Sequence, residues 1–410
     1  MRKNQKQDQC TVYERNGQLV LALNSEMMIP ENAPVRLLSA QLEELEYGKL
    51  YEAYSSKGRK SAAEPRVLFK VLIHGYLCGI YSSRKLEEAC QYRIDFRWLL
   101  EDRKAPDHST LARFRTGRCR EAVEDLFYQF VRKLEEAGET NHKAVFIDGT
   151  KLESRAGRYT FVWRKSVEKQ LTKVKERLKL LTRLTTSAAV RSLLEEAAKG
   201  IDFVSGKGKR KRQAQRDWEE KQSLLERWER YEAMLSTMGE GRGSYSKTDP
   251  DATFMRLKED HMRNGQLKPA YNVQIAVNSE YLTGLEVFSD RTDVKTLRPM
   301  LNMLSRRHQA RYEEVVADAG YESLENYLYL EQNGQLCFIK PTNYDQKKTK
   351  KFRKQVGRIE NMKYAPEEDS FTCAQGRKLH LRREATEVRD GQLVSTAWYR
   401  CENCSGCPHR

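Results

Sequence analysis

Ala144-Val145-Phe146-Ile147-Asp148 marks a change in the character of this sequence. The four apolar residues predict a short buried strand, and the aspartate places a carboxylate at its carboxyl end. The same pattern returns at Val315-Val316-Ala317-Asp318. In α/β sheets, ligands gather beyond the carboxyl ends of the strands. We therefore expect Asp148 and Asp318 to share one site.

Two carboxylates at one edge of a sheet suit a hard divalent cation. Mg²⁺ prefers oxygen ligands and keeps positions for water and phosphate oxygens. Two such ions about 3.5–4 Å apart activate an attacking water or 3′-hydroxyl and stabilise the leaving oxygen of a phosphodiester. Asp148 and Asp318 are therefore our candidate catalytic and Mg²⁺-binding residues. The alternative is that each aspartate only caps the next turn, and Asx-turn chemistry already explains Asp249, Asp251 and Asp260.

The sequence around these strands predicts an α/β domain over 141–340. Alternating apolar and polar residues predict further strands at 271–277 and 281–288, and 336–339 is predicted as another strand. An apolar helical stripe predicts a helix over 297–304. A long, charged and helical segment, 164–240, interrupts this pattern. Its apolar residues are spaced by three and four on both sides of a basic Gly-Lys-Arg stretch. We interpret it as an antiparallel helical hairpin inserted into the α/β domain.

A different pattern precedes the α/β domain. After an N-terminal lead over 1–60, which is polar at first and then mixed, residues 61–140 predict a compact all-helical domain. Apolar residues at helical spacing indicate helices near 66–80, 83–92, 107–117 and 123–134. Asp107 is placed to cap the third of these helices.

The charge of the chain favours a polyanionic partner. Its 74 Lys and Arg residues exceed its 58 Asp and Glu residues, which gives a net charge of +16. Nucleic acid is the preferred interpretation, because each neutralised phosphate releases counterions. The polar N-terminus does not resemble a signal peptide, and the most apolar stretch is too short to cross a bilayer. We expect a soluble, cytoplasmic, nucleoid-associated protein with no membrane partner.

Four of the nine cysteines gather within a basic segment, 341–410: Cys373, Cys401, Cys404 and Cys407. Cys401-x-x-Cys404-x-x-Cys407 has the spacing of zinc ligands. His409 follows Cys407 too closely to be an easy further ligand. A structural Zn²⁺ held by the four thiolates and a set of free thiols in a reducing compartment both stay open.

Three groups of residues resemble the DDE transposases of bacterial insertion sequences. The first includes Pro106-Asp107-His108-Ser109-Thr110, and the second is Phe146-Ile147-Asp148-Gly149-Thr150-Lys151. The third joins Asp249-Pro250-Asp251, Pro269-Ala270-Tyr271-Asn272-Val273-Gln274 and Ala317-Asp318-Ala319-Gly320-Tyr321. The resemblance extends over roughly 35–410. Each group alone is a weak signal, whereas the combination is specific.

The resemblance implies a fold and a reaction. The fold is an all-α N-terminal domain followed by a ribonuclease-H-like mixed sheet with helices. The reaction is metal-dependent DNA cleavage and strand transfer, with Mg²⁺ or Mn²⁺, by an enzyme bound to the terminal inverted repeats of its element and to target DNA. Asp148 and Asp318 would be the first two acids of the catalytic triad. A homodimer on the DNA is expected.

The resemblance also gives the helical domain a role. Its helices would form a helix-turn-helix-like unit with Arg113, Arg115 and Arg118 facing DNA. The alternative is a generic helical bundle, because any small helical domain exposes some arginines.

The sequence departs from the family in its third acid, which is a glutamate on a helix. The glutamates after Lys340 are Glu360, Glu367, Glu368, Glu384, Glu387 and Glu402, and none has a convincing helical context. We therefore expect a C-terminally truncated chain of impaired activity. A non-catalytic DNA-binding remnant or repressor, and a cellular nuclease of ribonuclease-H fold, are the alternatives.

Overall fold

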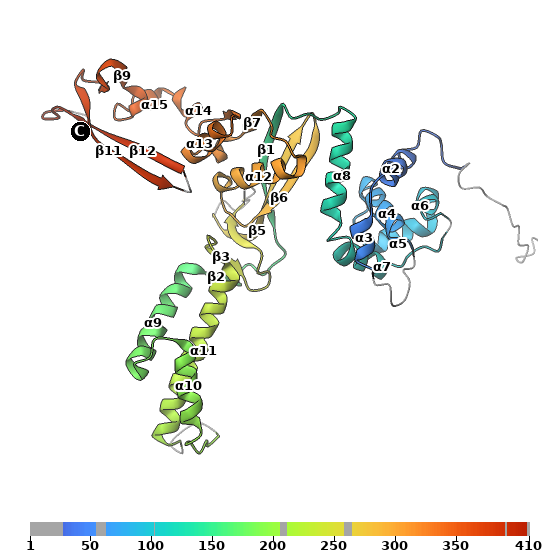
Figure 1. Cartoon of the computed structure of the whole chain (residues 1–410), viewed down its shortest axis with the longest axis horizontal. Helices are drawn as coiled ribbons and strands as arrows, with labels where there is room; N and C mark the ends of the chain where they lie inside the picture. Colours follow the sequence, from blue (N-terminus) through green and yellow to red (C-terminus); the bar gives the residue numbers. More distant parts are fainter. Residues whose placement is uncertain are drawn as a thin grey trace, which may run out of the picture. The chain divides into compact units, whose positions relative to one another are not determined.

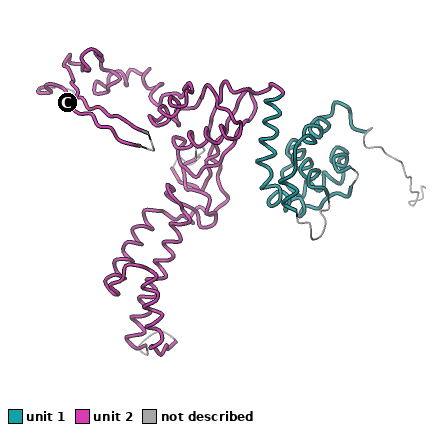
Figure 2. Tube along the Cα trace, in the orientation of Figure 1, with its two compact units in different colours: residues 1–136 teal, residues 137–410 magenta. Residues whose placement is uncertain are grey.

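The computed structural model describes residues 28–54, 63–101, 103–205, 211–257, 265–389 and 392–407. The chain forms two compact units, residues 1–136 and 137–410, which Figure 2 shows in different colours. Asp260, His409 and the basic tip of the inserted segment at 206–210 lie outside the described residues. No helix among the described residues is long and apolar enough to span a membrane.

The first unit is helical, as predicted. Its helices are α2 (Pro34–Glu43), α3 (Gly48–Glu52), α4 (Pro65–Leu77), α5 (Ser83–Tyr92), α6 (Ile94–Leu99), α7 (His108–Arg113) and α8 (Val123–Glu136), with a π-helical turn over Phe114–Arg118. Asp107 caps α7, because its carboxylate accepts a hydrogen bond of 2.6 Å from the Thr110 N–H. Val35, Leu42 and Leu50 pack into the same core as the later helices. The unit therefore begins well before residue 61, where the sequence suggested a boundary.

The second unit is built on a mixed six-stranded sheet (Figure 1). Its strands are β1 (Ala144–Glu153), β4 (Thr253–Arg256), β5 (Leu267–Asn278), β6 (Tyr281–Phe288), β7 (Glu314–Ala317) and β8 (Leu336–Ile339). β6, β5 and β1 are antiparallel neighbours, whereas β1, β7 and β8 run parallel. Helix α12 (Leu297–His308) lies between β6 and β7 in the chain, and α13 (Leu324–Gln332) connects the parallel strands β7 and β8. The connection from β7 to β8 thus contains a helix, as is usual for crossover connections between parallel strands.

The first strand is longer than the sequence suggested. We predicted that it ends at Asp148, but β1 continues to Glu153. Its pairing with β7 stops at Ile147, while its pairing with β5 continues through Asp148 to Glu153. The end of the apolar run therefore marks where one neighbouring strand stops, and the backbone remains extended because β5 still pairs with it.

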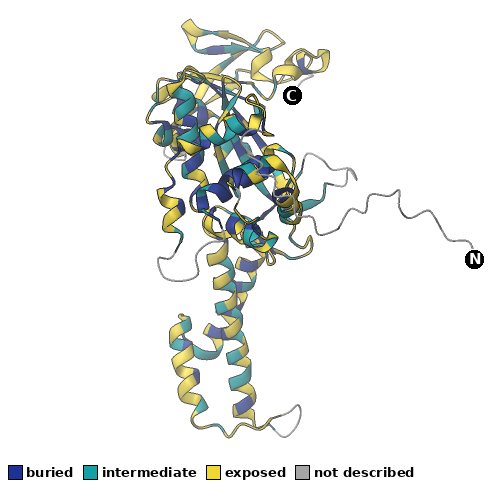
Figure 3. Cartoon of the chain, turned by 90° about the vertical axis from the view of Figure 1, so that its right-hand side faces the viewer, coloured by how far each residue is buried: buried dark blue, intermediate teal, exposed yellow. Residues whose placement is uncertain are grey.

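The insertion lies between β1 and β4. It contains α9 (Arg164–Thr182), α10 (Ser187–Ala198) and α11 (Gln213–Met238), and the short paired strands β2 (Phe161–Trp163) and β3 (Ser244–Ser246) close its base. Three helices thus replace the expected two-helix hairpin. The first arm is broken because Arg183 ends α9 in a left-handed conformation and Thr186 caps α10. Figure 3 shows many exposed residues along the helices of the insertion.

The segment after β8 forms a second, smaller sheet that the sequence did not predict. Its strands are β9 (Lys363–Ala365), β10 (Ser370–Thr372), β11 (Lys378–Arg389) and β12 (Gln392–Cys401), in the order β12-β11-β10-β9. Two single-turn helices, α14 (Tyr344–Lys347) and α15 (Lys350–Arg353), precede it. The four clustered cysteines lie at one end of this sheet, in or beside its turns.

Candidate active site

The register of the central sheet places Asp148 beside Asp318. Ile147 and Ala317 are the last paired residues of the parallel strands β1 and β7. Asp148 and Asp318 are the next residues on the two strands. The two carboxylates predicted to share a site therefore emerge from adjacent strands at the same edge of their pairing.

Each of the two aspartates is held by one backbone hydrogen bond. Asp148 Oδ1 accepts from the Gly149 N–H at 2.7 Å, and Asp318 Oδ1 accepts from the Gly320 N–H at 2.8 Å. Asp318 thus does cap the following turn, Ala319–Tyr321, as the alternative interpretation states. Both residues nevertheless stay exposed. Capping and metal binding are compatible here, because one backbone bond leaves most of the acceptor capacity of a carboxylate unused.

A third carboxylate, from Asp293, lies at the same site. Asp293 begins the 3₁₀ turn Asp293–Lys295 ahead of α12. A Cβ atom added to Gly320 would lie 2.9 Å from Asp318 Oδ1 and 3.3 Å from Asp293 Oδ2. The two carboxylates therefore both lie close to Gly320. The sequence analysis missed Asp293, because an aspartate before a helix is ordinary capping chemistry.

Three buried polar side chains lie next to the three aspartates. Asn272, Gln274 and Tyr321 are each fully buried. The Tyr321 hydroxyl donates to Gln274 Oε1, and Gln274 Nε2 donates to Asn272 Oδ1 at 2.8 Å. Such a network rigidifies a site when all its members have partners.

All three carboxylates affect the pKa of the Tyr321 hydroxyl. Burial raises the pKa of Tyr321 far above its usual value, and the negative charges of Asp293, Asp148 and Asp318 raise it further. The hydroxyl therefore stays protonated and keeps donating to Gln274. Within the part of the chain that the structure describes, none of the three aspartates has a Lys, Arg or His within ion-pair distance. A cluster of like charges without a cationic partner is what a divalent cation would neutralise.

Comparisons with known families are consistent with this geometry. Residues 23–117 match the model of a transposase domain, DUF772, and residues 242–397 match the model of a transposase DDE domain. Together the two matched segments cover more than half of the chain. The chain belongs to the DDE transposases of insertion sequences. No curated protein and no solved structure matches it.

Membership of this family confirms several expectations. The helical region followed by a mixed sheet with helices is the ribonuclease-H-like fold that the resemblance implied. The enzyme class is a DDE-type polynucleotidyl transferase, which acts on DNA with divalent metal ions. The DDE model spans Asp293 and Asp318 but begins after Asp148. The family model therefore does not include Asp148, and its place beside Asp318 follows from the pairing of β1 with β7.

Asp249, one of the other acids considered, has a structural role. Tyr271 donates its hydroxyl to both oxygens of Asp249, at 2.8 and 2.7 Å, and Ser154 donates to one of them. Burial raises the pKa of Asp249, but these hydrogen bonds outweigh it and hold the pKa below the usual value. Burial, together with the hydrogen bond to Asp249, raises the pKa of Tyr271 to about 12. Asp249 therefore links the loop before β4 to Ser154, just after the end of β1, and to Tyr271, in the first half of β5.

The glutamates considered for the third acid do not lie on α-helices. Glu360 lies in the turn Ile359–Asn361, Glu367 and Glu368 lie in the turn Pro366–Glu368, and Glu384 and Glu387 lie on β11, while Glu402 follows β12. None of these residues has the helical context that the resemblance implies for the third acid.

The three arginines predicted to face DNA each have an intramolecular partner. Arg115 donates to the Tyr81 carbonyl at 2.7 Å and to Ser83 Oγ at 3.2 Å, which fixes the start of α5. The Arg118 guanidinium lies 3.9 Å from the centre of the Tyr54 ring. Arg113 is exposed, and its contacts are with Ser109 in the preceding turn of its own helix.

The four clustered cysteines line one small cavity of about 140 Å³, together with Arg377. Cys373 begins a tight turn between β10 and β11, and Cys404 begins a similar one, with glycines at φ of +71° and +69°. The two turns meet because β11 and β12 pair beside them and Arg377 donates to the carbonyls of Asn403 and Ser405. The backbone N–H groups of Gln375 and Arg377 lower the pKa of the Cys373 thiol.

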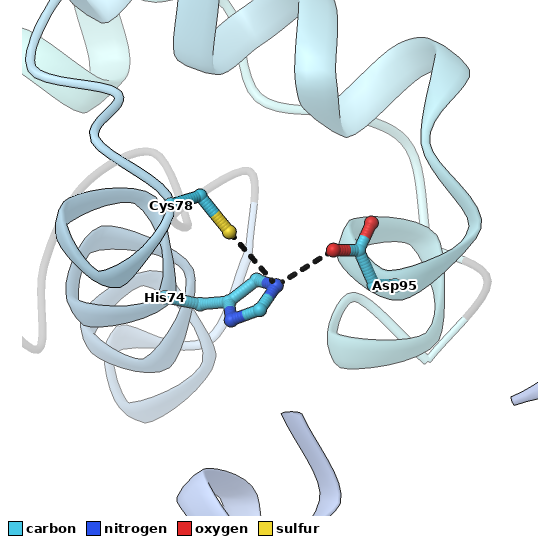
Figure 4. A group of neighbouring side chains, drawn as sticks. All are labelled: His74, Cys78 and Asp95. Atoms are coloured by element: carbon cyan, nitrogen blue, oxygen red, sulfur yellow. Dashed lines mark hydrogen bonds and ion pairs between the residues drawn. The ribbon is translucent and has the colours of Figure 1, made fainter. Parts of the chain in front are cut away.

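A second group of metal-type ligands lies in the helical unit (Figure 4). His74 Nε2 lies 2.8 Å from Asp95 Oδ2 and 3.7 Å from Cys78 Sγ. The Arg93 guanidinium donates to both oxygens of Asp95 and also reaches Cys78 Sγ at 3.5 Å. Burial raises the pKa of Asp95, and the bonds from Arg93 and His74 more than offset this effect. Arg93 thus already provides the positive charge that a metal ion would bring.

Proposed function

We propose that this transposase binds the terminal inverted repeats of its insertion sequence and cleaves and joins DNA there, with Mg²⁺ or Mn²⁺ bound by Asp148 and Asp318. The observation that carries the proposal is the pairing of Ile147 with Ala317, which makes the two aspartates neighbours on adjacent strands. Exposed carboxylate oxygens are the donor set that Mg²⁺ and Mn²⁺ prefer. The residues present therefore fit the metal.

The chemistry follows from charge and position. A divalent cation at the two carboxylates would activate the attacking oxygen and stabilise the leaving oxygen of the phosphodiester. The protein fixes the carboxylates on rigid strands, so little reorganisation is needed when the phosphate arrives. Burial and the neighbouring carboxylates raise the pKa of Tyr321 and keep it neutral, and its hydroxyl donates to Gln274, which holds that side chain in place. A homodimer on DNA is also part of the proposal.

The test is a cleavage assay on duplexes that end in the terminal repeats, with scrambled ends as the control. The proposal predicts cleavage that requires Mg²⁺ or Mn²⁺ and that prefers the repeat-ended duplex. Binding without cleavage would indicate the non-catalytic remnant or repressor. Cleavage of both duplexes at equal rates would indicate a nuclease of another role.

We also propose that Arg113 contacts DNA. Arg113→Ala should weaken binding to repeat-ended duplexes and reduce the dependence on log salt by about one unit, because one phosphate contact is lost. Arg113→Lys, which keeps the charge, serves as the matched comparison. Gel-shift titrations at several salt concentrations measure both quantities.

Arg115 and Arg118 extend the same test. Arg115→Ala should also lower the melting temperature, since its guanidinium holds the Tyr81 carbonyl and Ser83. We propose a DNA contact for Arg118 as well, made from its position over Tyr54. If Arg113→Ala and Arg115→Ala leave binding to the repeats unchanged, this surface of the helical unit does not contact DNA.

For the cysteine cluster we propose a structural Zn²⁺ held by Cys373, Cys401, Cys404 and Cys407. The support is that two tight turns bring four thiols to one small cavity, and four cysteine ligands are typical of structural zinc sites. Purified protein should contain about one zinc per chain. Cys404→Ser should lose the metal and lower the melting temperature, whereas Cys337→Ser, an exposed cysteine on β8, should change neither. A zinc content below about 0.2 per chain would remove the proposal.

A further inference from the structure

The carboxylate of Asp293 has two oxygens with different surroundings. Oδ1 accepts hydrogen bonds from Asn272 Nδ2 at 2.8 Å and from Gln274 Nε2 at 3.2 Å. Oδ2 lies near Gly320 and Asp318, since a Cβ added to Gly320 would lie 3.3 Å from Asp293 Oδ2 and 2.9 Å from Asp318 Oδ1. One oxygen is thus anchored by the buried network, and the other is directed toward the site of Asp148 and Asp318.

The hydrogen bonds that anchor Asp293 do not neutralise its negative charge. Its two donors are neutral amides, and both belong to fully buried side chains. Among the described residues, no basic side chain lies within ion-pair distance of Asp293. Although the chain has 74 basic residues, none of those described pairs with Asp293. Its negative charge lies beside that of Asp318, and the two like charges repel each other. Placing charges of one sign together costs free energy unless a cation offsets it.

Two glycines leave room for the carboxylate of Asp293, because a side chain at either position would crowd it. A Cβ on Gly149 would lie 3.0 Å from Asp293 Oδ1, and a Cβ on Gly320 would lie 3.3 Å from Oδ2. Both distances are shorter than ordinary contacts of a Cβ atom. The backbone thus approaches the carboxylate of Asp293 closely at Gly149, which follows Asp148 in β1, and at Gly320, in the turn after Asp318.

We propose that Asp293 is a third carboxylate of the divalent-metal site, binding the cation beside Asp318 through Oδ2. This inference rests on the proposed function of Asp148 and Asp318. Asp293 lies on the turn before α12, whereas Asp148 lies on β1 and Asp318 follows β7. The proposal therefore adds a ligand from a third part of the unit. Asn272 and Gln274 are then positioning residues, which act on the metal through Asp293.

The test compares two substitutions that separate charge from shape. Asp293→Asn keeps the size and the Oδ1 acceptor but removes the charge, whereas Asp293→Glu keeps the charge and changes the length. Titration of Mn²⁺ into the full chain with repeat-ended DNA, followed by calorimetry, measures affinity. We expect Asp293→Asn to weaken Mn²⁺ binding at least about tenfold, and Asp293→Glu to weaken it less. Asp290→Asn, three residues earlier, is the matched control and should bind as the wild type does.

The outcomes separate this inference from the proposed function. If Asp148→Asn abolishes Mn²⁺ binding while Asp293→Asn binds like the wild type, the role of Asp293 is wrong and the function stands. If neither Asp148→Asn nor Asp318→Asn changes Mn²⁺ binding, the proposed function itself is wrong. A merely structural Asp293 would reverse the order of the two variants, because the longer glutamate disturbs the network more than asparagine does. That reversal would overturn the inference even if both variants lose some stability.

Discussion

Asp148→Asn and Asp318→Asn should each lower the rate of repeat-end cleavage by about a thousandfold or to background, which corresponds to about 4 kcal/mol of transition-state stabilisation. Each substitution removes the negative charge that binds the cation, but it keeps the Oδ1 acceptor for the neighbouring N–H. Since both side chains are exposed, folding and DNA binding should persist. Cleavage at saturating DNA, with a gel shift in parallel, measures the two effects.

The double variant and a control sharpen this prediction. Because the two carboxylates act as one unit, the double variant should lose little more than either single variant. Asp251→Asn, an exposed aspartate before β4, should cleave as the wild type does. Wild-type cleavage by Asp148→Asn would show that the strand-end aspartates do not form the catalytic site.

Gly149→Ala should both destabilise the protein and impair cleavage. The added Cβ would overlap Gln274 Nε2 and would lie 3.1 Å from the Tyr321 hydroxyl. Gln274 cannot move away cheaply, because both atoms of its amide are hydrogen-bonded inside the core. We expect a loss of about 1–3 kcal/mol in the free energy of unfolding, together with a displaced Asp293. Denaturant unfolding and the cleavage assay measure the two losses.

Gly357→Ala is the matched control for this prediction, since a Cβ at Gly357 meets no atom within 4 Å. Its stability and cleavage should equal those of the wild type. Equal stability of Gly149→Ala and the wild type would show that the network under the site is loosely packed.

Much of the catalytic unit could be predicted from local sequence patterns. Apolar runs located β1 and β7, and alternation located β5 and β6, because each strand shows one buried face or is buried on both faces. The neighbouring positions of Asp148 and Asp318 followed from a general property of sheets rather than from any contact visible in the sequence. The family resemblance supplied the ribonuclease-H-like mixed sheet, which local patterns do not determine.

The elements that were missed depend on contacts between distant residues. Asp293 lies 145 residues after Asp148 in the sequence, and only the pairing of β5 with β1 brings its partners Asn272 and Gln274 to the site. The C-terminal sheet was missed because β11 is rich in charged residues and mostly exposed, so its apolar alternation is weak. The break between α9 and α10 depends on a left-handed Arg183, which has no clear sequence signal.

The arginines illustrate a different limit. Arg113, Arg115 and Arg118 follow the outward face of a predicted helix, but that helix changes to a π-helical turn at Phe114. Arg115 then reaches back to Tyr81 and Ser83 rather than projecting outward. Helical periodicity predicts the face of a side chain, and it does not predict which neighbouring carbonyl the side chain will bind.

The most direct measurement of the central claim is the amount of Mn²⁺ bound by the full chain on repeat-ended DNA, followed by electron paramagnetic resonance. Wild-type protein should bind Mn²⁺ that the Asp148→Asn, Asp318→Asn double variant does not bind, while Asp251→Asn should bind as much as the wild type. Equal Mn²⁺ binding by the wild type and the double variant would contradict the assignment of Asp148 and Asp318 to one metal site.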